Sequence, residues 1–398
     1  MHSIFFSLII LFLVATLLRM DWVYYLVYVI GGVWLFSHWW IRRAFSYLRV
    51  SRLLTQHAFP GEQIDASVTF TNESRVPIPW LHVQDRVPFQ LKDIQNYHTV
   101  MSVGSHSVAQ YEYTLRASKR GYYLVGPLSL DTGDLFGFAS TNWAENGTTD
   151  VIIYPQIVAL ETLGLPSRSP FGTQRSRQRL FADPARISGV REYAAGDSLR
   201  TIHWKASARE DVLQVKKLDP AISRNVTILL DLNQSAYPIS SAVGSSEWAI
   251  VIAASVASHL ITTQRQQVGL ITNGLDSQQE VRSAPLAART GRGHLMNLLS
   301  TLARVQMDDF SQSLADWLPS QLSSMEWGST LVVVAPDLDE RAMWALHNAY
   351  RRGSNVTALL VAPDENFLHR KAQSKQLGIH VYRTIWEKDL HAALDTVE

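Results

Sequence analysis

The chain has 398 residues, room for two or three domains, and a formal net charge of +1. A charge so close to zero excludes recognition of nucleic acid or of acidic substrates by overall charge. Cysteine is absent, which excludes disulfides, thiolate metal sites and a cysteine nucleophile. The hydrophobic fraction of 46% is unevenly spread, because residues 1–41 are almost entirely apolar or aromatic and the remainder has the composition of a soluble protein.

Two uncharged apolar runs open the chain, at residues 3–18 and 22–41. Each is close to the roughly 20 residues that cross a bilayer core. Only Arg19, Met20 and Asp21 separate them. We therefore predict two antiparallel transmembrane helices, at about residues 3–19 and 22–41, that form a hairpin within a first segment of residues 1–49. A cleaved signal peptide would need a basic start and a small-residue cleavage site, neither of which the sequence shows.

The orientation of this hairpin follows from its flanking charges. Four arginines come soon after the second run: Arg42, Arg43, Arg49 and Arg52. At the hairpin tip, Arg19 is offset by Asp21. The positive-inside rule then predicts a multi-pass protein of the inner (cytoplasmic) membrane, with both termini and the soluble region in the cytoplasm.

Residues 50–160 show the pattern of an antiparallel β-sandwich. Apolar and polar residues alternate at 66–72, 81–84 and 110–115, and turn residues such as Pro60 and Gly61 separate the runs. Short alternating strands with frequent turns are typical of such sandwiches. Because no catalytic set is visible here, we expect this domain to space, brace or bind.

A linker and a distinctive segment occupy residues 161–224. Six arginines make its first part basic: Arg168, Arg175, Arg177, Arg179, Arg186 and Arg191. One interpretation is a phosphate or nucleic-acid contact, and the other is a solvated connector. Groove-reading motifs are absent and the overall charge is balanced, so we favour the connector and expect no nucleic-acid partner.

The most specific pattern lies at residues 189–220. Its central residues are Gly196, Asp197, Arg200, Ile202, Trp204, Lys205, Ser207, Ala208 and Arg209. This run resembles the signature of the bacterial "domain of unknown function fifty-eight" family. The Arg120-Gly121-Tyr122 strand and the Asp134-Leu135-Phe136-Gly137 turn are also similar to that family.

The resemblance implies an architecture and partners. It implies two membrane helices, a β-sandwich and a C-terminal domain similar to a von Willebrand factor A domain. Members are commonly encoded near MoxR-type AAA+ ATPases and transglutaminase-like membrane proteins, which implies a shared complex. Six signature residues are predicted to serve interaction: Gly196, Asp197, Arg200, Trp204, Lys205 and Arg209.

No catalytic residue is predicted in the signature. Ser207, His203 and Asp197 have the residue types of a catalytic triad, but no nucleophile elbow or oxyanion motif accompanies them.

From residue 225 to 398, near-continuous apolar strands alternate with helices. Strands are expected at 226–232, 268–272, 331–335, 356–361 and 379–382, and helices at 246–263, 293–305, 340–352 and 386–396. This pattern predicts a parallel sheet covered on both faces, that is, a doubly wound α/β domain. Sites in such folds lie at the carboxyl ends of the strands.

Those strand ends carry oxygen ligands that suit Mg²⁺. By resemblance to the von Willebrand factor A domain, Asp231 and Ser235 match its metal site and Asp337 is a candidate for the later acid. Asn233 stands where that site has Ser, so we expect a degenerate site that binds metal weakly or not at all. The alternative is that Asp231 and Ser235 cap the following loop.

Two functions remain in view. The first is a non-enzymatic, membrane-tethered scaffold whose A-like domain docks a MoxR-type AAA+ ATPase or another partner. The second is a metal-assisted hydrolase that uses the same strand-end acids, which would need His or further carboxylates at the site. The sequence offers few of these, so we favour the scaffold.

Overall fold

The computed structural model describes residues 2–18, 21–93, 97–145, 147–160, 182–194, 202–210, 212–220, 225–309, 312–323, 325 and 328–389. The chain divides into two compact units. The first comprises Met1–Gln156 with Leu302–Arg304, and the second comprises Ile157–Thr301 with Val305–Glu398. Most of the predicted linker and three signature positions, Gly196, Asp197 and Arg200, lie outside the described residues.

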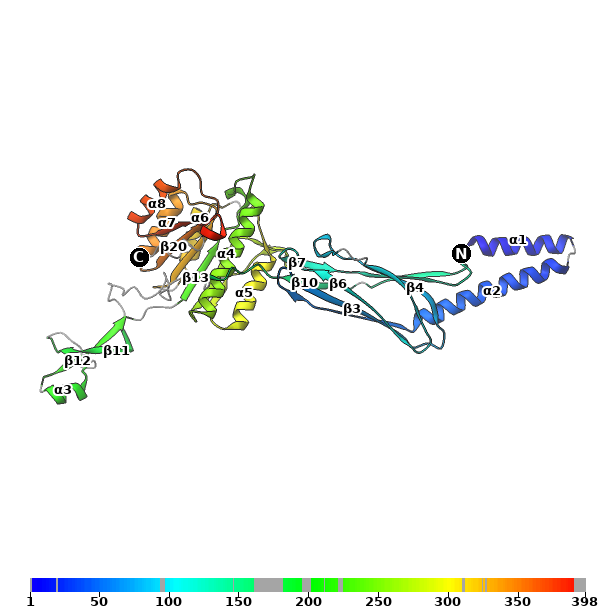
Figure 1. The fold of residues 1–398 in the computed structure, drawn as a ribbon, viewed down its shortest axis with the longest axis horizontal. Helices are drawn as coiled ribbons and strands as arrows, with labels where there is room; N and C mark the ends of the chain where they lie inside the picture. The colour runs from blue at the N-terminus through cyan, green and yellow to red at the C-terminus, as the bar shows by residue number, and fades with distance from the viewer. Residues whose placement is uncertain are drawn as a thin grey trace. The chain divides into compact units, whose positions relative to one another are not determined.

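Two helices open the first unit (Figure 1). They are α1 (His2–Leu18) and α2 (Asp21–Ser46). The ring of Phe5 lies 6.4 Å from that of Trp34, and the ring of Phe12 lies 5.8 Å from that of Tyr24. The earlier residue of α1 contacts the later residue of α2, and the later residue of α1 contacts the earlier one. The two helices therefore pack antiparallel.

The two predicted membrane spans are not supported by helix length and composition. Within the described residues, the helix that is both long and apolar enough to cross a membrane is α4 (Ala242–Thr262), and most of it is buried inside the second unit. A shorter apolar helix covers Phe5–Val14. With 17 residues, α1 rises about 26 Å, which is less than a hydrocarbon core of about 30 Å.

The rest of the first unit consists of three sheets. One has the order β1 (Leu48–Leu54), β3 (Gln63–Asn72) and β6 (Val108–Arg116). A second has the order β5 (His98–Val103), β4 (Ile78–Asp85), β8 (Leu128–Gly133) and β9 (Ser140–Ala144). A third joins β2 (His57–Ala58), β10 (Thr149–Ile153) and β7 (Gly121–Val125). A short 3-10 helix, η1 (Phe89–Leu91), follows β4.

The core of this unit follows from the period-two pattern of its strands. Alternate residues of β3, from Ile64 to Phe70, are buried. They join buried residues of β4, β6 and β8 in one apolar cluster, which also includes Ala44 of α2. Since only Tyr47 separates α2 from β1, the helix continues almost directly into the sheet.

Arg52, one of the four arginines predicted to flank the membrane, is instead buried in the sandwich. Arg52 lies on β1 with a side chain that is 5% exposed, and both Asp85 Oδ atoms accept hydrogen bonds from its Nη1 at 3.1 Å. It points into the sandwich because inward and outward positions alternate along the strand. Arg42, Arg43 and Arg49 are exposed.

The second unit is built on a six-stranded sheet. Its order is β17 (Leu286–Arg289), β14 (Gln267–Thr272), β13 (Asn225–Leu230), β19 (Thr330–Ala335), β20 (Asn355–Leu360) and β21 (His380–Arg383). All neighbours pair in parallel except β17, which is antiparallel at the edge. Strand order therefore reverses at β13, which is the topological switch of a doubly wound sheet.

Helices cover this sheet on two sides (Figure 1). On one side, α6 (Leu314–Ser323) and α7 (Glu340–Arg351) share an apolar cluster with the strands. On the other side, α4 contacts β13, β14 and β19. The remaining elements are α5 (Arg292–Arg304), α8 (Phe367–Gln376), η4 (Gln234–Ala236), and a small sheet of β15 (Leu275–Asp276), β16 (Val281–Arg282) and β18 (Val305–Gln306).

The sequence did not predict α6, α8 or β17. Pro319 lies inside α6, and proline normally signals the end of a helix. In α8 most residues are polar, so its apolar stripe is faint. The predicted final helix at 386–396 extends largely beyond the described residues.

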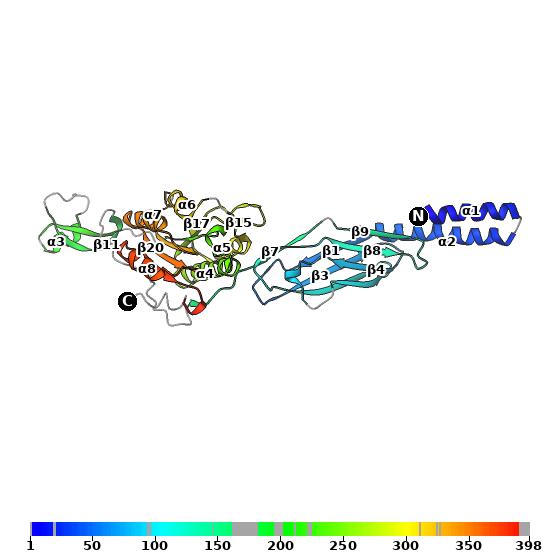
Figure 2. The ribbon, with the colours of Figure 1, turned by 90° about the horizontal axis from the view of Figure 1, so that it is seen from above.

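The signature segment forms a hairpin with a helix. Strands β11 (Ala182–Glu192) and β12 (Gln214–Pro220) pair antiparallel, and α3 (Trp204–Glu210) lies between them in the sequence (Figure 2).

Candidate functional site

The first candidate site lies at the carboxyl end of β13. Asp231 follows this strand, and its backbone N–H donates to Val334 O of the neighbouring β19 at 2.9 Å. The carboxylate therefore lies at the switch point between β13 and β19, where doubly wound folds bind ligands. Only 1% of Asp231 is exposed.

Hydrogen bonds hold one oxygen of this carboxylate. Asp231 Oδ1 accepts from Asn273 Nδ2 at 2.7 Å and from the Asn233 N–H at 3.0 Å. Asn273 also accepts from the Leu232 N–H at 2.7 Å, and the Tyr237 hydroxyl donates to Asp231 O at 2.7 Å. This network fixes the loop after β13 onto the end of β14.

The other oxygen, Asp231 Oδ2, is buried and has no hydrogen-bond partner. Burial raises the pKa of Asp231, and the hydrogen bonds from Asn273 and Asn233 oppose that shift only in part. A buried carboxyl with one unpartnered oxygen is more stable when protonated. The hydrogen bonds that Asp231 makes to Asn273 and Asn233 hold the loop after β13 in place.

Ser235 lies on the same loop as Asp231 but turns to other partners. Its hydroxyl lies 3.1 Å from Asn233 Oδ1 and 3.1 Å from Asp309 Oδ1, and its N–H donates to Asn233 Oδ1 at 3.2 Å. The N-cap of η4 is therefore Asn233, and Ser235 is the residue whose N–H it caps, so Ser235 is not the cap that the alternative names.

Asp337, the third predicted ligand, is engaged by a cation of the chain itself. It follows β19 and forms an ion pair with Nη1 of Arg370, whose Nη2 pairs with Asp364. The Leu338 N–H also donates to Asp337 Oδ1 at 2.8 Å. A guanidinium thus occupies the side of Asp337 that a metal ion would need.

These residues do not fit a Mg²⁺ site. Within the described part of the chain, no group of three or more His, Asp or Glu side chains is placed to hold a metal ion. Asp231 Oδ2 is the one oxygen of the three predicted ligands that is both buried and unpartnered. Mg²⁺ is usually held by one or two carboxylates with water completing its octahedral shell, whereas here Asp231 is buried and Asp337 is paired with Arg370.

The second candidate site is α3 of the signature. None of its residues is buried. Trp204 is 67% exposed, and Lys205 and Arg209 are exposed beside it. Because Lys205 and Arg209 are four residues apart on a helix, they lie on one face. The described signature residues thus present an indole with two cations.

The two described members of the triad are Ser207, within α3, and His203, which directly precedes that helix. Ser207 Oγ donates to His203 O at 3.1 Å and accepts from the Gln214 N–H at 2.8 Å. His203 Nδ1 accepts from the Ala206 N–H at 3.1 Å. Both side chains therefore cap or brace α3 through backbone groups, and neither contacts the other's side chain.

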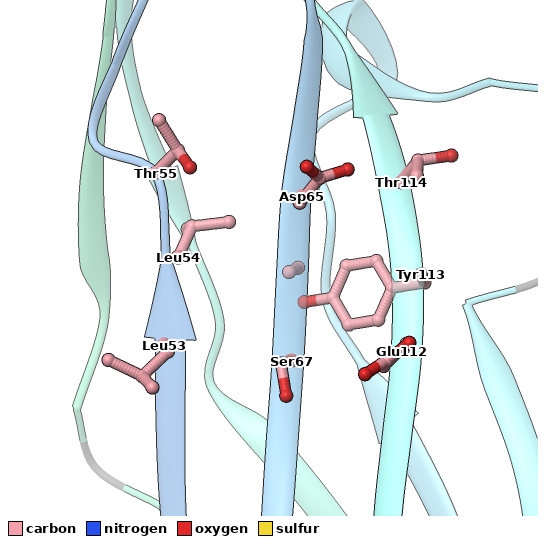
Figure 3. A pocket seen from close by; sticks show the side chains of 9 residues that line it. Leu53, Leu54, Thr55, Asp65, Ser67, Glu112, Tyr113 and Thr114 are labelled. Atoms are coloured by element: carbon pink, nitrogen blue, oxygen red, sulfur yellow. The ribbon is translucent and has the colours of Figure 1, made fainter.

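An open pocket lies on the sheet of β1, β3 and β6 (Figure 3). Its volume is about 670 Å³, and its lining includes Asp65, Glu112 and Tyr113. The Tyr113 hydroxyl donates to Asp85 Oδ2 at 2.5 Å. Burial, followed by the Asp85 charge, raises the pKa of Tyr113 well beyond its ordinary range, so this hydroxyl serves the Arg52–Asp85 pair rather than the pocket.

Sequence reasoning missed Asn273, which completes the strand-end network. Its signal was its position directly after the apolar strand β14, at the edge where Asp231 also lies. Parallel strands end at the same edge, so a polar residue after either strand is a candidate neighbour.

Several solved structures resemble about a quarter of the chain at low scores. The CARDB domain of the PF1109 protein from Pyrococcus furiosus is 15% identical with a TM-score of 0.21, and the match covers 27% of this chain and 91% of that domain. The GAE domain of GGA2p from Saccharomyces cerevisiae is also 15% identical, with a TM-score of 0.19, covering 26% of this chain and 88% of that domain. Scores this low carry no conclusion about fold or function.

Comparison with known sequences supports the signature. The uncharacterized protein YeaD of Bacillus subtilis is 21% identical over 354 residues, which cover 86% of this chain and 83% of YeaD. Residues 189–370 match the family described as "Protein of unknown function DUF58". That range begins in β11, contains α3 and runs into α8. The family predicted from the signature is therefore confirmed, and residues 189–370 are a DUF58 segment.

Proposed function

We propose that this protein is a non-enzymatic, membrane-anchored scaffold that docks a MoxR-type AAA+ ATPase through its DUF58 segment. In this proposal α1 and α2 form the membrane anchor, the sandwich braces the soluble region against membrane partners such as a transglutaminase-like protein, and the second unit is the von Willebrand factor A-like domain. Exposed Trp204 carries the docking part of the proposal.

The anchor is supported by the surface of its helices. Many large apolar side chains of both helices are exposed, among them Leu17 at 85%, Tyr25 at 71% and Leu35 at 63%. A helix that is apolar all round is stable when it is buried, either in a protein core or in lipid. Most described residues of α1 and α2 are not buried in the unit, which favours lipid as the surroundings of their exposed surfaces.

The docking surface is supported by the exposure of Trp204. An indole that is 67% exposed contributes little to the fold. Trp and Arg are enriched among the residues that carry most of the energy of protein interfaces. Lys205 and Arg209 add positive charge, so the surface suits a partner with an apolar cleft bordered by acids.

The strand-end network favours a scaffold over a hydrolase. Asp231, Ser235 and Asp337 all have partners within the chain, and a metal hydrolase would need these oxygens for the ion.

Affinity purification of the tagged full chain from native membranes tests the proposal. We expect a MoxR-type AAA+ ATPase to co-purify with the wild type and to be lost with Trp204→Ala. A matched control is Trp386→Ala, which removes an indole that is 70% exposed and lies outside residues 189–370. Absence of any AAA+ ATPase contradicts the proposal. Turnover in a substrate panel, abolished by Asp231→Ala, would establish the hydrolase instead.

A further inference from the structure

Two loops of the sandwich contact the carboxyl-terminal part of α2 at different positions along the helix, and a third loop contacts one of these two. The turn at residues 134–139, between β8 and β9, contacts α2 through a side-chain hydrogen bond between Asp134 and Ser37. The loop at residues 73–77 contacts Trp40, whose Nε1 donates to Pro77 O at 3.0 Å. The loop at residues 104–107 reaches only the 73–77 loop, through the His106 N–H and Ser74 O at 3.1 Å.

The rise per residue of an α-helix gives the position of each contact along the axis of α2. The 73–77 loop also meets the chain just after the helix, since the Glu73 N–H donates to Tyr47 O at 3.1 Å. At 1.5 Å per residue, Ser37 lies about 4.5 Å closer to the start of α2 than Trp40, and about 15 Å closer than Tyr47. The turn at 134–139 is therefore the loop that reaches furthest along the helix.

This furthest loop is also the one with exposed apolar side chains. Leu135 is 77% exposed and Phe136 is 66% exposed. The other two loops expose polar or charged residues, including Glu73, Arg75 and Ser105. Apolar exposure and reach along α2 thus coincide. The Phe136 ring stacks on that of Phe138 at 6.3 Å, yet most of the Leu135 and Phe136 surface stays exposed.

The polar groups of Asp134, which contacts Ser37, have hydrogen-bond partners within the turn itself. Asp134 Oδ1 accepts from the Ala139 N–H at 2.8 Å, Oδ2 accepts from the Phe136 N–H at 3.2 Å, and the Asp134 N–H donates to Ala139 O at 3.0 Å. Ser37 is 3% exposed. A loop that enters a region poor in water must pair its own polar groups in this way.

The length of α2 gives the position of the turn relative to a bilayer. Measured from Asp21, Ser37 lies about 24 Å along the axis, inside a hydrocarbon core of about 30 Å. Trp40 and the exposed Arg42 and Arg43 follow, at the level of the headgroups.

We propose that the turn at residues 134–138 inserts Leu135 and Phe136 into the lipid next to α2, as a second membrane contact that fixes the sandwich against the bilayer. The partner is phospholipid, because the residues directly before Ser37 on α2, Leu35 and Phe36, are exposed and apolar, and exposed arginines follow it at Arg42 and Arg43. This inference rests on the proposed anchor.

The absence of cysteine makes a direct test simple, because each introduced thiol is unique. The full chain is prepared as Leu135→Cys, Leu35→Cys and Ser105→Cys, labelled with the environment-sensitive fluorophore NBD, and reconstituted in vesicles of phosphatidylcholine and phosphatidylglycerol. Lipids that carry a doxyl quencher near the headgroup then report contact. Phe136→Cys is a second turn variant, in case Leu135→Cys impairs folding.

We expect blue-shifted emission and strong doxyl quenching at Leu135→Cys and Leu35→Cys, with neither at Ser105→Cys. Quenching at Leu35→Cys without quenching at either turn variant overturns this inference and leaves the anchor standing. Quenching at none of the four positions contradicts the anchor as well. Equal quenching at Ser105→Cys, or a blue shift at the turn without quenching, also overturns the inference, because it indicates adsorption or a protein contact.

Discussion

The buried ion pair of the sandwich gives a sharp prediction. Arg52 and Asp85 have side chains that are 5% and 0% exposed, and Tyr113 donates to the same carboxylate. Arg52→Met keeps most of the side-chain volume but leaves a buried carboxylate with no opposite charge. Removing one partner of a buried pair costs about 3–5 kcal/mol. A domain of this size is typically stable by about 5–15 kcal/mol, so the loss is a large fraction of the total.

The same strand offers a matched control. Arg49 pairs with Glu73 at 2.9 Å, but its side chain is 76% exposed. An exposed pair contributes about 0–1 kcal/mol, so Arg49→Met should change stability little. Adding Asp85→Asn to Arg52→Met should restore part of the loss, because it removes the uncompensated charge while an amide oxygen can still accept from Tyr113.

Hydrogen exchange of the full chain, read by mass spectrometry, separates the two units. Since about 1.4 kcal/mol equals a factor of ten, the slowest amides of β3 and β4 should exchange roughly a hundredfold or more faster in Arg52→Met. Peptides of β13 and β19 serve as the internal reference. Equal exchange in Arg52→Met and Arg49→Met would refute the reasoning.

Two further predictions concern the second unit. Burial raises the pKa of Asp231 above its usual 3.8, so the native state keeps a proton that the unfolded chain releases, and this contribution to stability falls as pH rises through that interval. Asp231→Asn should therefore gain thermal stability relative to the wild type as pH rises above about 4, and a relative loss would contradict the assignment. Gly378 has φ +76°, and an added Cβ would lie 2.3 Å from the Tyr350 ring, so Gly378→Ala should destabilise by more than the roughly 1–2 kcal/mol of a left-handed residue alone. Gly293→Ala, with open space around it at the start of α5, should be neutral or stabilising by up to about 1 kcal/mol in urea unfolding, and similar losses in both variants would refute the packing argument.

Local patterns predicted the elements whose burial is simple. The strand before Asp231 was visible because both faces of a central parallel strand are apolar, and its end gave the position of the candidate site. In the same way, alternation in β3 revealed a half-buried strand.

Long-range pairing was the part that local patterns did not contain. Arg52 looked like one more charge at the membrane surface, and its partner Asp85 is 33 residues away on a different sheet. Asp337 was predicted as a metal ligand, but in the fold it forms an ion pair with Arg370. Each case depends on which side chains the fold brings together, and that information is spread over the whole chain.

The docking of a AAA+ ATPase through Trp204 is tested most directly by a binding titration. The full chain, embedded in nanodiscs, is titrated with a purified MoxR-type ATPase from the same organism. We predict saturable binding that Trp204→Ala weakens about thirtyfold, as the loss of about 2 kcal/mol at an interface hot spot requires, and that Trp386→Ala leaves unchanged. Absence of binding, or equal affinities for the wild type and Trp204→Ala, would contradict the proposed function.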